Sequence, residues 1–199
     1  MRLVIVRHVT QKDPAEGWVG KGGCGHRNVC EGSVIMNNLI TTVAQYLLFF
    51  VLAAATIFWL FLPRRDKVGL AVQAIVSLVV VVVLIKVAAS IYADPRPFVV
   101  DPSIRPLFAH SADNGFPSDH TAVAATVAFL VMIYHRWFGA VLLAASLVLG
   151  ASRIAAHVHH AQDIVGGVLI AALAVGVASA MWRWVEPPLR RRLTKPAPG

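Results

Sequence analysis

Three short blocks of the sequence contain arginine, serine and histidine side chains that could bind and transfer a phosphoryl group, and a lysine lies upstream of them. Arginine can bind two phosphate oxygens at once, lysine supplies a movable point charge, and a hydroxyl adds a neutral donor. A phosphoryl group spreads negative charge over several oxygens in its transition state, so this combination predicts a phosphate site. The predicted phosphate-binding residues are Lys86, Arg96 in D-P-R-P-F, Ser118 in F-P-S-D-H, and Arg153.

His159 and Asp163 carry the prediction of covalent catalysis. They are four residues apart, so on a helix the carboxylate lies close enough to hold one ring nitrogen. The imidazole held in this way is oriented and more basic, and its other ring nitrogen is free to attack phosphorus. His120, on a different segment, can then protonate the departing oxygen and later activate water. The pattern predicts a phosphohistidine intermediate on His159, with His120 as general acid and base.

The run H-V-H-H also has the ligand types of a transition-metal site, with Asp163 as a fourth ligand. Arg96 and Arg153 would repel a divalent ion but suit an anion, so we expect no metal and no cofactor. The other histidines of the second half are interpreted as structural: His110, His135, His157 and His160. The other charged residues between 94 and 113 are interpreted as solvated loop charges: Asp94, Asp101, Arg105 and Asp113.

The elements that must position these residues lie in a membrane. Of the 199 residues, 57% are hydrophobic and only 14% are charged. Apolar segments near the roughly 17–25 residues needed to cross a bilayer recur at 39–62, 68–91, 121–134, 138–151 and 164–184. The third is short, so we expect its N-terminal end to lie below the membrane surface in a protein-lined recess. The fold class predicted is an all-α, polytopic membrane helix bundle with about five transmembrane helices.

The distribution of charge predicts the orientation of this bundle. The net charge is +8, but the basic residues form no aromatic-interleaved stripe, so we expect no nucleic-acid partner. If the loop at 64–67 is cytoplasmic, Arg136 and the basic tail fall on the cytoplasmic side too, as the positive-inside rule prefers. The three blocks then meet on the opposite, extracytoplasmic face of the plasma membrane.

Three regions follow from this pattern: a polar segment over residues 1–37, a membrane-embedded domain over 38–185, and a basic cytoplasmic tail over 186–199. We expect the first segment to be poorly ordered. Its apolar stretch at 3–6 is too short for the core of a signal peptide, and Met36 would make a natural start. Cys24 and Cys30 are expected as free thiols, with a local disulfide or a metal site with His26 as alternatives.

The three blocks resemble the signature motifs of the type 2 phosphatidic acid phosphatase superfamily over about residues 38–185. The third motif of that family is Ser-Arg, five residues, His, three residues, Asp, as in Ser152, Arg153, His159 and Asp163. The resemblance implies that His159 is the nucleophile, Asp163 its partner and His120 the acid and base. It also implies that the phosphate ligands are Lys86, Arg96, Ser118 and Arg153.

Two positions depart from the common pattern of this family. The usual lysine seven residues before Arg96 is Ala89 here, and Lys86 lies ten residues before it, so Lys86 needs a kinked connection to reach the site. Asp119 replaces the usual glycine of the second motif. The resulting F-P-S-D-H-T, with the five-span layout, is similar to the bacitracin-resistance type of undecaprenyl pyrophosphate phosphatase.

These features predict a metal-independent lipid phosphatase that converts undecaprenyl pyrophosphate to undecaprenyl phosphate, the carrier lipid of cell-wall synthesis. A first alternative is a phosphatase of glycerolipid phosphates, such as phosphatidic acid or phosphatidylglycerol phosphate, because the catalytic motifs are shared. A second, of another class, is a non-catalytic membrane protein that binds or transports anions. The predicted partner is a lipid phosphate within the membrane, and the sequence does not indicate an oligomeric state.

Overall fold

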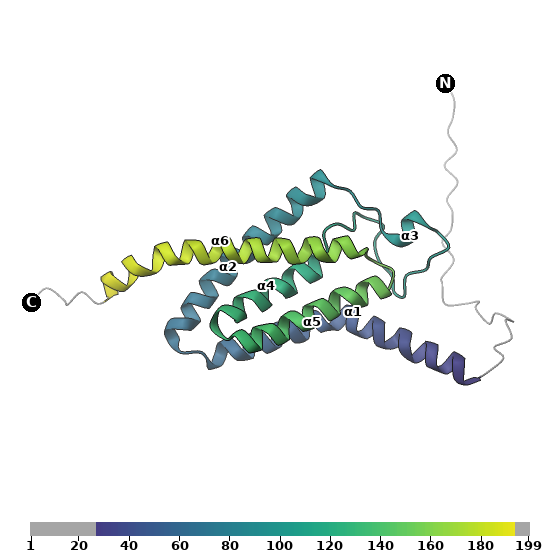
Figure 1. Ribbon diagram of the computed structural model, residues 1–199, viewed down its shortest axis with the longest axis horizontal. Coiled ribbons are helices and arrows are strands. Elements are labelled where there is room, and N and C mark those ends of the chain that lie inside the picture. The colour runs from purple at the N-terminus through teal and green to yellow at the C-terminus, as the bar shows by residue number, and fades with distance from the viewer. Residues whose placement is uncertain (1–26, 194–199) are drawn as a thin grey trace, which may run out of the picture.

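The computed structural model describes residues 27–193, with side chains over 32–186, and this part of the chain is all-helical. Two long helices, α1 (Arg27–Phe61) and α2 (Arg64–Ile91), are followed by a short turn of helix, α3 (Pro97–Val100). Three more helices complete the bundle: α4 (Asp119–Tyr134), α5 (Arg136–Ala155) and α6 (Ala161–Leu193). Figure 1 shows these helices running roughly lengthwise, with α3 and its loops gathered at one end.

Helix α4 is the centre of the bundle and packs against α1, α2, α5 and α6. Its sequence is apolar on every side, which is the pattern of a helix surrounded by others. Small side chains such as Ala122, Ala124 and Ala128 are fully buried there and let the neighbouring helices approach closely. The motif at the start of α4 is therefore held by contacts from all sides.

The surrounding helices expose large apolar side chains on their outer faces. Such a surface is unfavourable in water but matches the hydrocarbon of a bilayer. Four helical segments are long and apolar enough to cross a membrane: Gly32–Phe61, Arg64–Ile91, Arg136–Ala155 and Ala161–Glu186. Together with the shorter α4 they confirm the predicted polytopic bundle of about five helices.

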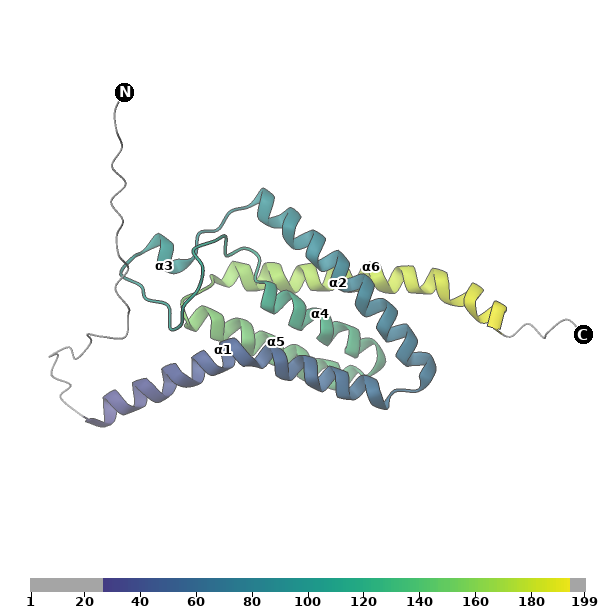
Figure 2. The same cartoon turned by 180° about the vertical axis from the view of Figure 1, so that it is seen from behind.

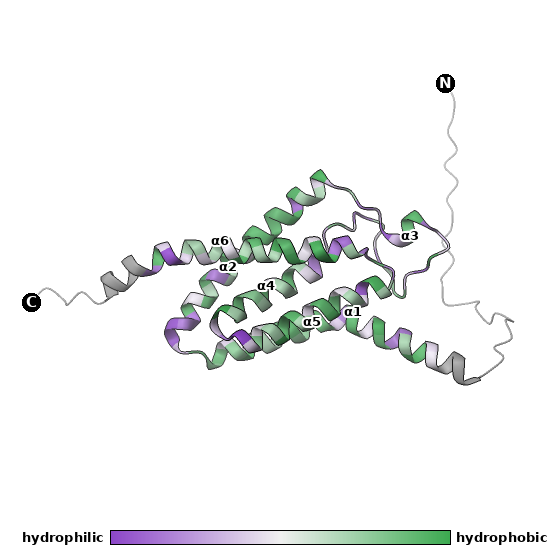
Figure 3. Cartoon of the chain, in the orientation of Figure 1, coloured by the Kyte–Doolittle hydropathy of each residue, from purple (hydrophilic) through white to green (hydrophobic). Residues whose placement is uncertain are grey.

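Polar residues concentrate at the two ends of the bundle (Figure 3). One end, called here the site end, holds the connection from α2 to α4 and the turn from α5 to α6. The other, called the hairpin end, holds the turn from α1 to α2 and the turn from α4 to α5. Figure 2 shows α1 and α2 diverging from the hairpin end. Since α4 has 16 residues, it is about 24 Å long, shorter than a hydrocarbon core of roughly 30 Å.

Two glycines allow the close helix contacts that position the site. A Cβ atom on Gly167 of α6 would lie 2.9 Å from the carbonyl oxygen of Ser118, at the start of α4. A Cβ atom on Gly139 of α5 would collide with the Cα atom of Met132 in α4. Both obstacles are backbone atoms, which cannot rotate away, so any side chain at these positions would push α4 from its neighbours.

The helices differ from the predicted segments at both ends of the chain. Helix α1 begins at Arg27, eleven residues before the predicted start of the membrane domain at 38, and α6 continues to Leu193, beyond the predicted boundary at 185. Residues 1–26 and 194–199 lie outside the described part of the chain. The predictions for Cys24 and Cys30 fall outside the described side chains, so the state of these thiols stays a prediction.

Candidate active site

His159 and Asp163 form a buried pair in the turn from α5 to α6. The Nδ1 atom of His159 lies 3.1 Å from Oδ2 of Asp163, and the two side chains are 3% and 0% exposed. His159 precedes α6, so the pair does not lie on one helical face as expected. Asp163 instead reaches back from the first turn of α6, where its Oδ2 also accepts the N–H of His160 at 2.8 Å. The bond to the N–H of His160 is one half of a capping box, and it fixes the carboxylate beside the imidazole.

The other ring nitrogen of His159 faces Arg96. Nη1 of Arg96 lies 3.4 Å from Nε2 of His159, and Arg96 is only 5% exposed. Because a guanidinium can only donate, Nε2 is assigned as the unprotonated nitrogen and Nδ1 as the one that donates to Asp163. Arg96 is itself held by the carbonyl of Val158 at 2.7 Å and by an ion pair with Asp113 at 2.8 Å. A cation is thus fixed next to the free nitrogen.

Arg153 brings a second buried cation to this end of the bundle. It is 2% exposed, and its Nη1 donates to the carbonyl of Ala44 in α1 at 3.1 Å. Its Nη2 lies 3.0 Å from Nε2 of His110, whose ring centroid is 6.2 Å from that of His159. The Nε atom of Arg153 is buried without a hydrogen-bond partner among the described residues. Arg153 therefore keeps a donor available for a ligand.

The start of α4 supplies a hydroxyl and a second histidine. Ser118 is fully buried, and its N–H donates to the carbonyl of Asp163 at 3.1 Å, which ties this motif to the third one. Its Oγ lies 3.2 Å from Oγ1 of Thr121. His120, in the first turn of α4, is partly buried and interacts electrostatically with Arg153 and His159. The second and third motifs therefore meet, as the sequence analysis expected.

Lys86 is the predicted ligand that the structure does not bring to the others. It lies on α2 with an exposed side chain, next to the exposed Val87. Within the described residues no hydrogen bond or ion pair involves it. Its role in phosphate binding stays a prediction, now without support from the geometry.

Four residues interpreted from the sequence as structural or solvated belong to this site. Asp94 is buried rather than solvated, and its Oδ2 lies 2.9 Å from Nδ1 of His160. Asp113 pairs with Arg96, and His110 contacts Arg153. In the sequence, the only indication that Asp94 belongs to the site is its position two residues before Arg96. Nothing in the sequence indicates that His110 or Asp113 belongs to it. Contacts across 17 to 66 residues cannot be read from local spacing.

Burial and nearby cations favour the neutral forms of His159 and His110. Burial lowers the pKa of His159, and Arg153 and Arg96 lower it further, whereas the hydrogen bond to Asp163 opposes the shift. Burial also lowers the pKa of His110, with added effects from Arg96 and Arg153. A neutral imidazole keeps the lone pair that a nucleophile needs, so the burial of His159 favours its reactive form.

One group of side chains has the donors of a metal site. Ligand atoms of Asp94, His160 and Asp163 lie within 4.8 Å of one another. The same carboxylates already hold His159, His160 and Gln162 through hydrogen bonds. A bound ion would have to displace these contacts.

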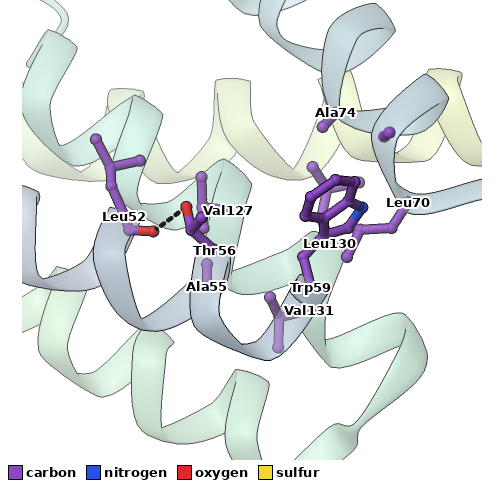
Figure 4. A pocket seen from close by; sticks show the side chains of 10 residues that line it. Leu52, Ala55, Thr56, Trp59, Leu70, Ala74, Val127, Leu130 and Val131 are labelled. Carbon is purple, nitrogen blue, oxygen red and sulfur yellow. Dashed lines mark hydrogen bonds between the residues drawn. The ribbon is translucent and has the colours of Figure 1, made fainter. Parts of the chain in front are cut away.

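An apolar cavity of about 230 Å³ lies between α1, α2 and α4, toward the hairpin end. Figure 4 shows its lining, with Trp59, Leu70 and Leu130 together at one end, where they pack in one hydrophobic cluster. The hydroxyl of Thr56 is used by the carbonyl of Leu52 at 2.8 Å. This cavity has no group suited to phosphate chemistry and can accept only hydrocarbon.

Residues 70–187 match the family described as the PAP2 superfamily, which is more than half of the chain. The chain belongs to the PAP2 superfamily. This confirms the resemblance drawn from the three motifs. The matched residues span most of α2, the whole of α3, α4 and α5, and most of α6, and therefore include all three motifs.

Two curated relatives support a closer assignment within the PAP2 superfamily. The bacitracin transport permease protein BcrC of Bacillus licheniformis is 30% identical over 156 residues, which are 78% of this chain and 74% of that protein. The undecaprenyl-diphosphatase BcrC of Bacillus subtilis (strain 168) is 26% identical over 149 residues, or 75% and 74% of the two chains. The expected similarity to the bacitracin-resistance type is confirmed.

A solved structure shares the fold of this PAP2 protein. The crystal structure of Aquifex aeolicus LpxE superposes with a TM-score of 0.58 and 23% identity, covering 73% of this chain and 86% of that one. Together with the apolar helices, this match establishes a multi-pass membrane protein of the PAP2 fold.

Proposed function

We propose that this PAP2 protein hydrolyses undecaprenyl pyrophosphate to undecaprenyl phosphate and inorganic phosphate, through a phosphohistidine on Nε2 of His159. The observation that carries the proposal is the buried His159–Asp163 pair, whose free nitrogen faces a fixed arginine. The name of the relative from Bacillus subtilis, undecaprenyl-diphosphatase, supports the substrate. The apolar cavity between α1, α2 and α4 is consistent with a ligand that carries a long hydrocarbon chain.

The first chemical step forms the bond from Nε2 of His159 to the terminal phosphorus. The bond between that phosphorus and the bridging oxygen breaks, and undecaprenyl phosphate leaves with its electron pair. His120 donates a proton to the departing oxygen. Asp163 stabilises the positive charge that develops on the imidazole during the attack.

The second step returns the enzyme to its starting state. Neutral His120 takes a proton from water, whose oxygen attacks the phosphorus, and the bond to Nε2 breaks. Inorganic phosphate leaves, and His159 recovers its lone pair. Arg96, Arg153 and Ser118, with the unpaired N–H groups at the start of α4, stabilise the negative charge of the phosphoryl group in both steps.

The proposed site faces the extracytoplasmic side of the plasma membrane. The hairpin end carries Arg64, Arg65 and Lys67, together with Arg136 and Arg183, and the positive-inside rule assigns such residues to the cytoplasm. Such an enzyme regenerates the carrier lipid on the side where its pyrophosphate is released. It has no cofactor in this proposal, and its partner is the lipid itself.

Phosphate release by the purified protein in detergent with excess chelator tests the proposal. We expect faster release from undecaprenyl pyrophosphate than from phosphatidic acid, and a loss of at least about 10⁴-fold with His159→Ala. His157→Asn is the matched control, because His157 is exposed and has a φ of 61°, which asparagine tolerates. Release that stops with chelator, or that survives His159→Ala, would contradict the mechanism.

The same measurement separates two other functions. Preference for phosphatidic acid would favour a glycerolipid phosphatase. The name of the relative from Bacillus licheniformis, bacitracin transport permease protein BcrC, raises transport as a second alternative, which here would be transport of an anion. Transport needs the cations but no nucleophile, so in that case His159→Ala would leave anion uptake into proteoliposomes unchanged.

A further inference from the structure

His160, which follows the proposed nucleophile, has a carboxylate partner of its own. Its Nδ1 lies 2.9 Å from Oδ2 of Asp94, and this oxygen also accepts from Nε2 of Gln162 at 2.7 Å. The side chain of His160 is 37% exposed, whereas that of Asp94 is 11% exposed. Two consecutive histidines are thus each held at Nδ1 by a different aspartate, His159 by Asp163 and His160 by Asp94.

Asp94 joins all three segments that form the site. Its N–H donates to Oδ1 of Asn114 at 2.8 Å, and its carbonyl accepts the N–H of Gly115 at 2.8 Å. These contacts bind the end of the α2 connection to the loop before α4. The bond to His160 adds the turn from α5 to α6. The side chain of Gln162, in the first turn of α6, bonds the same oxygen of Asp94, and the carboxyl group of Asp163 interacts with Asp94 as well.

The position of Arg96 depends on this junction, because Arg96 lies two residues after Asp94. Its Nη1 lies 3.4 Å from Nε2 of His159, close to where a phosphoryl group on that nitrogen would be. The backbone N–H of His160 also donates to Asp163 Oδ2, the atom that orients His159. A shift of His160 would therefore disturb the nucleophile and the cation at the same time.

We propose that His160 is a positioning residue for phosphoryl transfer, which acts through the bond from its Nδ1 to Asp94 and sets Arg96 against His159. The inference rests on the proposed function. It assigns no contact between His160 and the substrate. It predicts that the Nδ1 atom matters and the Nε2 atom does not.

Two amide substitutions distinguish the ring nitrogens. The amide nitrogen of His160→Asn lies where Nδ1 was and can donate to Asp94, whereas that of His160→Gln lies one bond further, near the position of Nε2. We expect kcat within about threefold of wild type for Asn, and about 10- to 100-fold lower for Gln and Ala, since small misplacements of reacting groups have effects of this size. KM should change less than about threefold, because the lipid chain is held elsewhere.

A double-mutant cycle tests whether the two residues act through one bond. If they do, His160→Ala, Asp94→Ala and the double variant should lose kcat to nearly the same extent. If the losses of kcat in the two single variants multiply in the double variant, the proposal is overturned. It is also overturned if His160→Gln retains activity and His160→Asn loses it, because the role would then belong to Nε2. His157→Asn is the control, and a melting temperature in detergent identifies any variant that fails to fold.

The rates are compared on whichever of undecaprenyl pyrophosphate and phosphatidic acid the wild type hydrolyses. If the wild type hydrolyses neither, the proposed function fails whatever His160 does. If the wild type is active and every His160 variant equals it, the positioning role alone is wrong.

Discussion

The two ends of the bundle both bury polar side chains, but they bury different kinds. At the site end the buried groups include four ionisable ones: Arg96, Arg153, His159 and Asp163. At the hairpin end the charged residues that line a cavity of about 490 Å³, including Arg65, Asp66 and Arg183, are exposed. The buried groups there are neutral amides and hydroxyls.

Gln73 illustrates the second kind. It is 3% exposed on α2, and its Nε2 donates to the Tyr134 hydroxyl at 2.7 Å, while its Oε1 accepts from Oγ of Ser179 at 3.2 Å. These bonds join α2, α4 and α6. Neutral hydrogen bonds of this type hold membrane helices together at modest gain.

The difference indicates which end does chemistry. Burying a charge costs far more than burying an amide, and a buried ion pair is often no more stabilising than apolar residues of the same size. Packing alone would not select two buried arginines beside a histidine. Function at the site end and helix association at the hairpin end account for the contrast.

The largest expected effect compares the histidines at the two ends of α4. His120→Ala should lower kcat by about 10³-fold, since general acid and base catalysis contributes on this scale, and phosphoenzyme should accumulate when water is not activated. His135, just after α4, accepts the N–H of Phe138 with its Nδ1 at 3.1 Å. His135→Ala should leave kcat unchanged and lower the stability by about 1 kcal/mol.

Rapid-quench labelling with a radioactive terminal phosphate measures both histidine variants. Equal losses of kcat at His120 and His135 would remove the distinction between the two ends. Labelled protein that fails to accumulate with His120→Ala would contradict its role in the second step.

A smaller effect is expected from exchanging arginine for lysine at each end. Arg153 bonds Ala44 and His110 through two nitrogens at once, which a single ammonium cannot reproduce in the same geometry. Arg153→Lys should therefore lower kcat/KM by about 10²-fold. Arg183→Lys, at the exposed hairpin end, should have almost no effect. The comparison uses steady-state phosphate release, and a similar loss in both variants would show that burial is not what matters.

The pH dependence sharpens the role of burial at the site end. Because the pKa of His159 is lowered, chiefly by burial, the neutral nucleophile persists below the ordinary histidine pKa of about 6.5. The rate should fall only as pH drops through that lowered pKa. A profile of kcat/KM between about pH 4.5 and about pH 8.5, roughly two pH units either side of the ordinary value, measures it. An acidic limb at or above about 6.5 would contradict the assignment.

The smallest effect on activity is expected at Gln73. Gln73→Leu removes the bonds to Tyr134 and Ser179 without adding a charge. The free energy of unfolding in detergent should fall by about 1 kcal/mol, while kcat stays within about twofold of wild type. A large loss of kcat with unchanged stability would mean that hydrogen bonds at the hairpin end influence catalysis at the site end.

The sequence predicted the helices and the motifs because both are local patterns. The apolar segments predicted the four helices that are long enough to cross a membrane, and the fifth, α4, is as short as expected. The bounds of α1 and α6 were missed because polar residues continue both helices beyond the apolar core. Arg96, Arg153, His120 and His159 come together as predicted, since each lies in a motif of fixed spacing.

The remaining parts of the site could not be predicted, because they depend on how loops pack. Asp94 and His160 are 66 residues apart, and Arg153 and His110 are 43 apart. Neither pair has a periodic pattern. Lys86 is the converse case: spacing in the sequence places this cation near the expected position on α2, but its side chain is exposed, and its role as a phosphate ligand stays a prediction.

The contact of Gly167 with Ser118 has a consequence for how this protein tolerates mutation. A survey of all single substitutions, scored by growth or turnover, should find Gly167 nearly as intolerant as His159, although Gly167 has no side chain to react. Gly139, where a Cβ atom would collide with Met132, should behave in the same way. A map of intolerance would therefore outline the surfaces that let α4 fit between its neighbours, as well as the residues that handle phosphate.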